Sequence, residues 1–343
     1  MTTHLQTLQR IAHNPLLTID DITWDYKKKR SIMFPSVIDM ADKLETPIDR
    51  FYMYLASHGG REIGFATAPT LEGPWTMHND PVLHLDNCPA ATGHLSSPEI
   101  IYHNNHFILY YHGNCPDEVL AEQNRRMPTH YYHRIQNSGA ATSTDGIHFN
   151  VHPNPLLLPI TTPDHWRVAT NMYLRVIATK TGCHGFFMTM SREEADYNNV
   201  TKQMPKDQRK ARPHPTCIGH AWSPDGLDWT LDETGPTLTA EETCGEYHRI
   251  RHIGLTRIDE TQVLATYSCF ANTEETRENI FAATLKLDGQ NVRVVQKHGT
   301  ILSPEHEWEN NNVRDPFPIF HDGKLYLYYA GGREHGIGLA ISG

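Results

Sequence analysis

Four segments of this sequence carry polar and charged residues where a buried strand would normally be apolar. They are residues 94–99, 166–171, 246–252 and 310–315. Their Asp, Glu and His side chains can donate or accept a proton during bond cleavage. Their Arg side chains offer several N–H donors to an oxygen-rich ligand. We therefore expect a functional site where the four segments meet.

Two carboxylates and one histidine are the candidate catalytic residues. Alternation along a strand would point both Glu99 and Asp315 toward the interior. His248 is the candidate proton donor, with His252 as an alternative. The residues that we expect to contact a substrate are His94, Arg167, Asn171, Glu246, Arg251, His252 and Arg314.

The sequence indicates no metal site and no cofactor. No C-x-x-C spacing occurs, and the 6 cysteines lie far apart, as expected of reduced, buried thiols. The alternative is a structural Ca²⁺ or another divalent cation near the center of the fold. Its candidate ligands are His94, His112, His248 and His252.

A short repeat shows which elements position these residues. A strand-like pattern of the type Ile-Gly-x-Ala-x-Ser recurs five times, beginning near residues 63, 139, 218, 280 and 337. An aromatic strand precedes each copy, and an Asp-Gly or Gly-Pro turn follows four of them, which is typical of hairpins. Four strands per unit and five units predict an all-β, five-bladed β-propeller with four-stranded antiparallel blades.

The blades are expected at residues 31–84, 94–158, 168–239, 248–302 and 313–343 of one domain. The last copy of the repeat ends at Gly343, which leaves the fifth blade without its outermost strand. We expect the strand-like segment Leu17–Trp24, within residues 14–26, to supply it and close the ring. Two packed β-sandwiches are the alternative fold.

Loop lengths differ between the two faces of such a propeller. Connections on one face are short turns, whereas those on the other are long, for example residues 113–136 and 191–216. The four polar segments begin inner strands on the face with long loops, where binding sites usually form. We expect the site at that mouth of the central channel.

Composition excludes several classes of function. The formal net charge of −10 argues against a nucleic-acid-binding surface. No apolar run approaches the length of a membrane span, and the first residues do not resemble a secretory signal. We expect a cytoplasmic protein that binds neither nucleic acid nor a membrane, and the sequence leaves its oligomeric state open.

Two pairs of segments resemble blades of the five-bladed glycoside hydrolases, above all family 43. They are Ser97–Tyr102 with Phe107–His112, and Arg314–Phe320 with Gly323–Tyr329. The resemblance implies a carbohydrate substrate and an inverting glycosidase (EC 3.2.1.-) active in carbohydrate metabolism. Such an enzyme has a blade-one Asp base, a blade-two Asp that modulates pKa and a blade-three Glu acid. More distantly, the chain resembles the mannoside phosphorylases of family 130.

The chain departs from the family 43 pattern at two of these three positions. Phe34 stands where the base is expected, and the blade-three strand that begins at Asn171 has no carboxylate. Glu99 replaces the modulating Asp, and Asp315 occupies in blade five the place of the missing base. Inverting hydrolysis needs two carboxyl groups roughly 6.5–9.5 Å apart, and we expect Glu99 and Asp315 to form that pair.

Two alternatives remain open. The arginines near the mouth suit an anionic sugar, on which a His base could support elimination by a lyase or phosphorolysis by a phosphorylase. A propeller can also bind sugar, or serve as an interaction scaffold, without catalysis.

Overall fold

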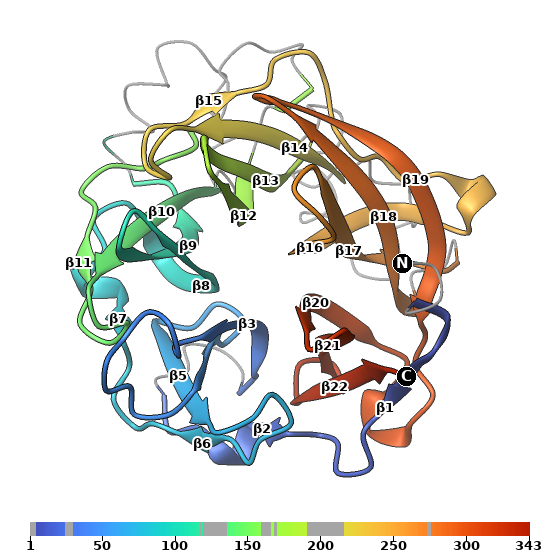
Figure 1. The fold of residues 1–343 in the computed structure, drawn as a ribbon, viewed down its shortest axis with the longest axis horizontal. Helices are drawn as coiled ribbons and strands as arrows, with labels where there is room; N and C mark the ends of the chain where they lie inside the picture. Colours follow the sequence, from blue (N-terminus) through green and yellow to red (C-terminus); the bar gives the residue numbers. More distant parts are fainter. Residues whose placement is uncertain are drawn as a thin grey trace, which may run out of the picture.

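The computed structural model describes residues 5–24, 30–116, 118, 136–158, 166–167, 170–190, 216–272 and 276–343. The chain is all-β, and its strands form five blades around a central axis (Figure 1). Short 3-10 helices lie between strands, namely η1 (Ile19–Asp21), η2 (Leu85–Asn87), η5 (Glu242–Cys244) and η6 (Glu307–Glu309). Among the described residues, no helix is long and apolar enough to cross a membrane.

Blades one and two each run outward from the axis as an antiparallel meander. The strands of blade one are β3 (Met33–Asp39), β4 (Phe51–Ala56), β5 (Glu62–Ala68) and β6 (Thr76–Met77), with β7 (Leu83–His84) also paired to β5. Those of blade two are β8 (Thr92–His103), β9 (His106–Asn114), β10 (Gln136–Ser143) and β11 (Asn150–Val151).

Blades three and four form one continuous sheet because a parallel bridge joins β14 to β16 at Thr216 and Arg249. The strands of blade three are β12 (Asn171–Thr179), β13 (Gly182–Met190), β14 (Thr216–Ser223) and β15 (Thr230–Leu231). Those of blade four are β16 (Tyr247–Arg257), β17 (Gln262–Phe270), β18 (Glu278–Asp288) and β19 (Asn291–Leu302).

Blade five is completed by the N-terminus, as predicted. Its strands are β20 (Val313–His321), β21 (Lys324–Gly331), β22 (Gly336–Ser342) and, from the other end of the chain, β1 (Leu8–Arg10) and β2 (Leu17–Thr18). The main closing strand thus lies upstream of the expected segment Leu17–Trp24, of which only the first two residues pair with β22. Arg10 of β1 stabilizes this pairing of the N-terminus with blade five, because its Nε donates a hydrogen bond to Glu309 Oε1 of η6 at 2.6 Å.

Packing explains the glycines of the repeat. Gly139 and Gly338 lie on third strands, where the rings of Tyr111 and Tyr329 from the second strands lie against them. A Cβ at either glycine would clash with the ring. The recurrent Gly is therefore required by an aromatic side chain on the neighboring strand.

Buried tyrosines connect consecutive blades. The hydroxyl of Tyr54 in β4 donates to the carbonyl of Gly146 at 2.6 Å, and that of Tyr110 in β9 donates to Gly226 at 2.9 Å. Both glycines lie in the Asp-Gly turns of the next blade. These turns therefore end hairpins and also accept a hydrogen bond across each blade interface.

We expect Tyr110→Phe to lower the free energy of unfolding by about 1–2 kcal/mol, because the buried Gly226 carbonyl loses its donor. Urea unfolding measures the change, with Tyr326→Phe as the matched control because Tyr326 is only half-buried. Equal stability of the two variants would argue against the inter-blade contact.

A histidine pair lies inside blade three. His184 Nδ1 is 3.0 Å from His220 Nε2, and both side chains are buried. One imidazole must donate and the other accept, so at least the acceptor must be neutral. Burial lowers the pKa of each to about 4.

This pair makes folding sensitive to acid. Between about pH 6.5 and 4 the unfolded chain binds protons that the folded pair excludes, so acidification lowers the free energy of unfolding. Above this range the two imidazoles are neutral in both states, and the pair makes its full contribution to the free energy of unfolding. The expected loss is on the order of 3 kcal/mol for each imidazole. We expect His220→Gln to flatten the pH dependence of the unfolding midpoint, whereas a control substitution of the exposed His106, His106→Gln, leaves it unchanged. Parallel profiles for both variants would contradict this role.

Candidate functional site at the propeller axis

Each inner strand has one non-glycine residue in the left-handed region. The φ angles are 49–60°, and in each strand the residue begins a β-bulge that shifts the register against the second strand. One such residue comes from each blade, in the order Phe34, Ser97, Tyr173, His252 and Asp315. We call these five residues the axial ring.

The side chains of the axial ring meet at the center. The Phe34 ring, from blade one, lies 5.6 Å from Tyr173 of blade three and 5.5 Å from His252 of blade four. Contacts between blades that are not neighbors require the side chains to converge on the axis. Ser97 joins them through His112 Nδ1, and the His112 ring is 4.7 Å from Tyr173.

Asp315 is the most unusual member of the axial ring. Its side chain is 0% exposed and lies 2.6 Å from His252 Nδ1. The contact is poorly aligned, so neither carboxylate oxygen has a hydrogen-bond donor among the residues that the structure describes. Buried polar groups without partners are rare, and each requires an explanation such as a bound ligand or a catalytic role.

Proton affinities in this pair are shifted in opposite directions. Burial raises the pKa of Asp315 despite the nearby charges of Arg314, Arg175 and Arg251. Burial lowers the pKa of His252 well below its usual value, and Arg314 and Arg251 act in the same direction. The imidazole is therefore neutral near pH 7, and the carboxyl group holds its proton more tightly than a solvent-exposed aspartic acid does.

A rim of alternating charges surrounds Asp315. Arg251 Nη2 donates to Glu278 Oε1 at 2.8 Å, and Arg314 Nη1 donates to Glu334 Oε1 at 3.0 Å. Although burial opposes the shift, Arg251 and Arg314 lower the pKa of Glu278. Each arginine charge at the rim is thus matched by a carboxylate.

Arg175 and Glu99 form the floor beneath the axial ring. Arg175 Nη1 donates to Glu99 Oε2 at 2.6 Å and to the Pro98 carbonyl at 2.6 Å, and its Nε donates to the Ile253 carbonyl at 3.2 Å. Pro98 and Ile253 directly follow the axial-ring residues Ser97 and His252. The guanidinium therefore fixes the backbone next to two members of the ring.

Glu99 and Asp315 lie at different depths along the propeller axis. From the sequence, the two carboxyl groups are expected instead to face each other as an acid/base pair. The bulges break the alternation of each strand, so that Glu99 is equivalent to Arg175 and Phe317, whereas Asp315 is equivalent to Ser97. Glu99 also accepts from Ser36 Oγ at 3.0 Å and from the Val176 amide at 3.3 Å. Burial raises its pKa and Arg175 opposes this shift. Its oxygens are occupied within the floor.

Three of the predicted contact residues lie in other networks. Buried Arg167 donates to Glu233 at 2.5 Å, and buried Asn171 donates to the Leu158 carbonyl at 3.0 Å. Glu246 is 0% exposed and accepts from Tyr267 and Lys297 in blade four. No described contact links these three side chains to the axial ring.

The remaining predictions fall at or near the axis. His94 is half-buried, with its ring 5.1 Å from His112, while Arg251, His252 and Arg314 lie around Asp315 as described above. The side chain of His248 lies outside the described residues. Sequence reasoning missed Glu278 and Glu334. Glu278 is the first residue of β18, and Glu334 lies in the turn between β21 and β22, so neither belongs to an inner strand.

Metal ligation has no support in the described ranges. There, no group of three or more His, Cys, Asp or Glu side chains is arranged to hold an ion. The rings of His94, His112 and His252 instead contact aromatic rings or each other.

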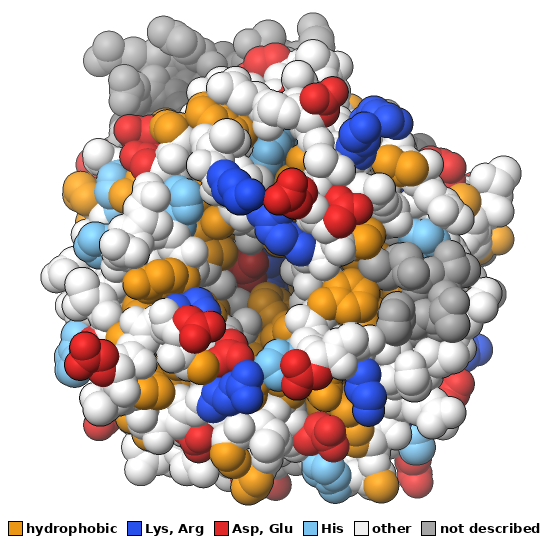
Figure 2. Space-filling model, in the orientation of Figure 1, with side chains coloured by type: hydrophobic (Ala, Val, Ile, Leu, Met, Phe, Trp, Pro, Cys, Tyr) orange, Lys and Arg blue, Asp and Glu red, His pale blue; other side chains and the backbone are white. Residues whose placement is uncertain are grey.

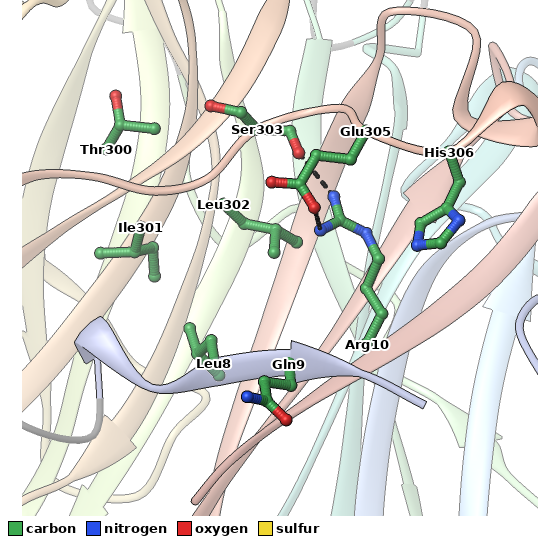
Figure 3. Close-up of a pocket in the computed structure, with 9 residues that line it drawn as sticks. All are labelled: Leu8, Gln9, Arg10, Thr300, Ile301, Leu302, Ser303, Glu305 and His306. Carbon is green, nitrogen blue, oxygen red and sulfur yellow. Dashed lines mark hydrogen bonds and ion pairs between the residues drawn. The ribbon is translucent and has the colours of Figure 1, made fainter. Parts of the chain in front are cut away.

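Two other features bear on the location of the site. Figure 2 shows one face of the disc, with a central hollow and with basic and acidic side chains interspersed around it. A groove of about 410 Å³ lies at the periphery between β1 and the end of β19. There Arg10 reaches across to Glu305 at 3.0 Å and to the Ser303 carbonyl (Figure 3), so its guanidinium group is already bound by residues of the groove itself.

Sequence comparison finds a distant relative of this chain. No family model matches the chain. An uncharacterized protein of Acanthamoeba polyphaga mimivirus is 24% identical over 372 residues, covering 96% of this chain and 88% of the relative.

Solved structures of carbohydrate-active enzymes share the fold. A structure from the GH130 family of mannoside phosphorylases, described as containing glycoside hydrolases that target β-1,2 mannosidic linkages in Candida mannan, has a TM-score of 0.65 at 12% identity, over 97% of this chain and 93% of its own. A thermostable family-43 glycoside hydrolase has a TM-score of 0.60 at 14% identity, over 93% and 92%. An N-acetylgalactosamine deacetylase from F. plautii has a TM-score of 0.62 at 12% identity, over 98% and 95%. The five-bladed propeller fold is therefore confirmed.

Proposed function

We propose that this protein is a glycosidase that binds a neutral oligosaccharide over the axial ring. In this proposal Asp315 is the carboxyl group that exchanges a proton with the glycosidic oxygen. The observation that carries the proposal is the buried Asp315 carboxyl group, which has no hydrogen-bond donor in the described part of the chain and lies 2.6 Å from a neutral His252. A general acid needs a raised pKa and a site that holds its proton until the substrate arrives.

The charge balance of the rim favors a neutral substrate. Arg251 and Arg314 are already paired with Glu278 and Glu334. An anionic sugar or a phosphate ion would have to compete with these carboxylates for the guanidinium groups. A sugar ring without charge can instead accept from the arginines and donate to the glutamates through its hydroxyl groups.

Glu99 has a different role in this proposal from the one expected from the sequence. It holds Arg175, which in turn fixes the peptides that follow Ser97 and His252. We propose that Glu99 is a positioning residue and that the second functional carboxylate lies at the rim.

An activity panel tests the proposal. The purified protein is incubated with neutral and uronate-containing oligosaccharides, with and without inorganic phosphate. We expect reducing sugar to be released from a neutral substrate, independently of phosphate and without an ultraviolet-absorbing product. A requirement for phosphate would indicate a phosphorylase, and an unsaturated product a lyase. Binding without turnover would indicate a sugar-binding scaffold.

A further inference from the structure

Glu334 lies in the turn between β21 and β22, held over the axis by a strained backbone. Arg333 and Glu334 both have positive φ, 53° and 78°, which non-glycine residues rarely adopt outside functional or tightly constrained sites. The Glu334 carbonyl accepts from the Ile32 amide of blade one at 2.8 Å. The turn is thus anchored across the junction of blades five and one, with the Glu334 side chain only 10% exposed.

The spacing between Glu334 and Asp315 is limited by Arg314, which contacts both. Arg314 Nη1 is 3.0 Å from Glu334 Oε1, and Arg314 Nε is 3.8 Å from Asp315 Oδ1. The guanidinium group spans the gap between these two contacts, so Glu334 Oε1 and Asp315 Oδ1 lie at most about 9 Å apart, which does not exceed the upper end of the range used by inverting glycosidases. That range leaves room for the scissile bond and one water molecule.

The two oxygens of Glu334 have different surroundings. Oε1 accepts from His58 Nδ1 at 3.0 Å and from Arg314 Nη1 at 3.0 Å. The hydrogen bonds described for this carboxylate all go to Oε1, which leaves Oε2 available to a water molecule.

The proton affinities of the two carboxyl groups diverge. Although burial opposes the shift, the hydrogen bond from His58 and the charge of Arg314 lower the pKa of Glu334. Burial raises the pKa of Asp315. Two titratable groups pushed apart in this way in one site are a recurrent sign of an acid and a base.

We infer that Glu334 is the second catalytic carboxylate and acts as the general base. This inference rests on the proposed function. Glu334 Oε2 takes a proton from water as the water oxygen bonds to the anomeric carbon. The bond from that carbon to the glycosidic oxygen breaks, and the oxygen takes the proton of Asp315. Transfer of a proton from Glu334 to Asp315 through solvent restores the starting state, and the product has inverted configuration.

A leaving-group comparison tests the assignment. The substrates are a hydrolyzed neutral oligosaccharide and a set of dinitrophenyl glycosides of neutral hexoses and pentoses. Dinitrophenolate leaves without protonation, so it does not need a general acid. We expect Glu334→Gln to lower kcat by about 100- to 1,000-fold on both kinds of substrate, because water is attacked in both. We expect Asp315→Asn to be impaired on the oligosaccharide alone.

Controls separate catalysis from folding. Glu305→Gln removes an exposed carboxylate of the peripheral groove and should leave kcat unchanged. If Glu334→Gln fails to fold, Glu334→Asp keeps the charge with a shorter side chain, and we expect an intermediate loss on both substrates. If a folded Glu334 variant has the wild-type kcat while Asp315→Asn is impaired as expected, Glu334 is not the base and the inference is overturned. The proposed function would not be affected by that result. Full activity of Asp315→Asn on the oligosaccharide would overturn the proposed function itself.

Discussion

Replacing Asp315 with Asn should lower the kcat for oligosaccharide hydrolysis by about 1,000-fold, because general acid catalysis typically contributes a factor of this order. The substitution keeps the size of the side chain and removes its acidic proton, since an amide does not ionize near neutral pH. Asp315 is fully buried and has no hydrogen-bond donor in the described structure. The free energy of unfolding should therefore stay constant or rise, since a neutral amide costs less to bury than a carboxyl group that can ionize.

The matched control is Asp322→Asn in the turn between β20 and β21. Its side chain is 88% exposed, and we expect neither activity nor stability to change. Steady-state kinetics and urea unfolding of both variants provide the measurement. A Asp315→Asn variant that keeps its kcat but loses stability would assign Asp315 to the structural framework instead.

Replacing Arg175 with Met should lower the free energy of unfolding by about 3–5 kcal/mol, the usual cost of breaking a buried ion pair from one side. Arg175 is 1% exposed and Glu99 is 3% exposed. Without the guanidinium, Glu99 would remain buried beside the Pro98 and Ile253 carbonyls that have lost their donor. The axial ring should then lose its fixed geometry, and activity should fall with stability.

A double variant shows whether the two residues act as a pair. In Arg175→Met with Glu99→Gln, no charge is left alone in the floor, so we expect part of the lost stability to return. The control is Lys180→Met, which breaks an exposed ion pair with Glu260 and should change stability by less than about 1 kcal/mol. Strictly additive effects of the two floor substitutions would contradict the pairing.

The blades could be predicted because packing forces a repeated sequence pattern. Gly139 and Gly338 recur at equivalent positions because a ring from the neighboring strand lies against each of them. The closing strand was predicted only in part. A missing strand in blade five required a partner from the N-terminus, but β1 has three residues and pairs too briefly to leave a strand pattern in the sequence.

The candidate site was harder to predict, for a physical reason. Alternation of side chains along a regular strand predicts that Glu99 and Asp315 lie together. Each inner strand instead has a bulge at a left-handed residue, and this bulge puts Glu99 and Asp315 at non-equivalent positions of their strands. A Pro after Phe34, Ser97 and Asp315 was the available signal, since these three axial-ring residues precede proline. Glu278 and Glu334 could not be found in this way, because Glu278 begins the third strand of blade four and Glu334 lies in a turn of blade five, so neither belongs to an inner strand.

The location of a bound sugar tests the central claim most directly. A crystal structure of Asp315→Asn with a neutral oligosaccharide that the wild-type protein hydrolyzes would show where the substrate lies. We predict that the glycosidic oxygen lies within hydrogen-bonding distance of residue 315, with sugar hydroxyl groups on Arg314 and Glu334. An oligosaccharide bound in the peripheral groove beside Arg10, with the axial ring empty, would contradict the account.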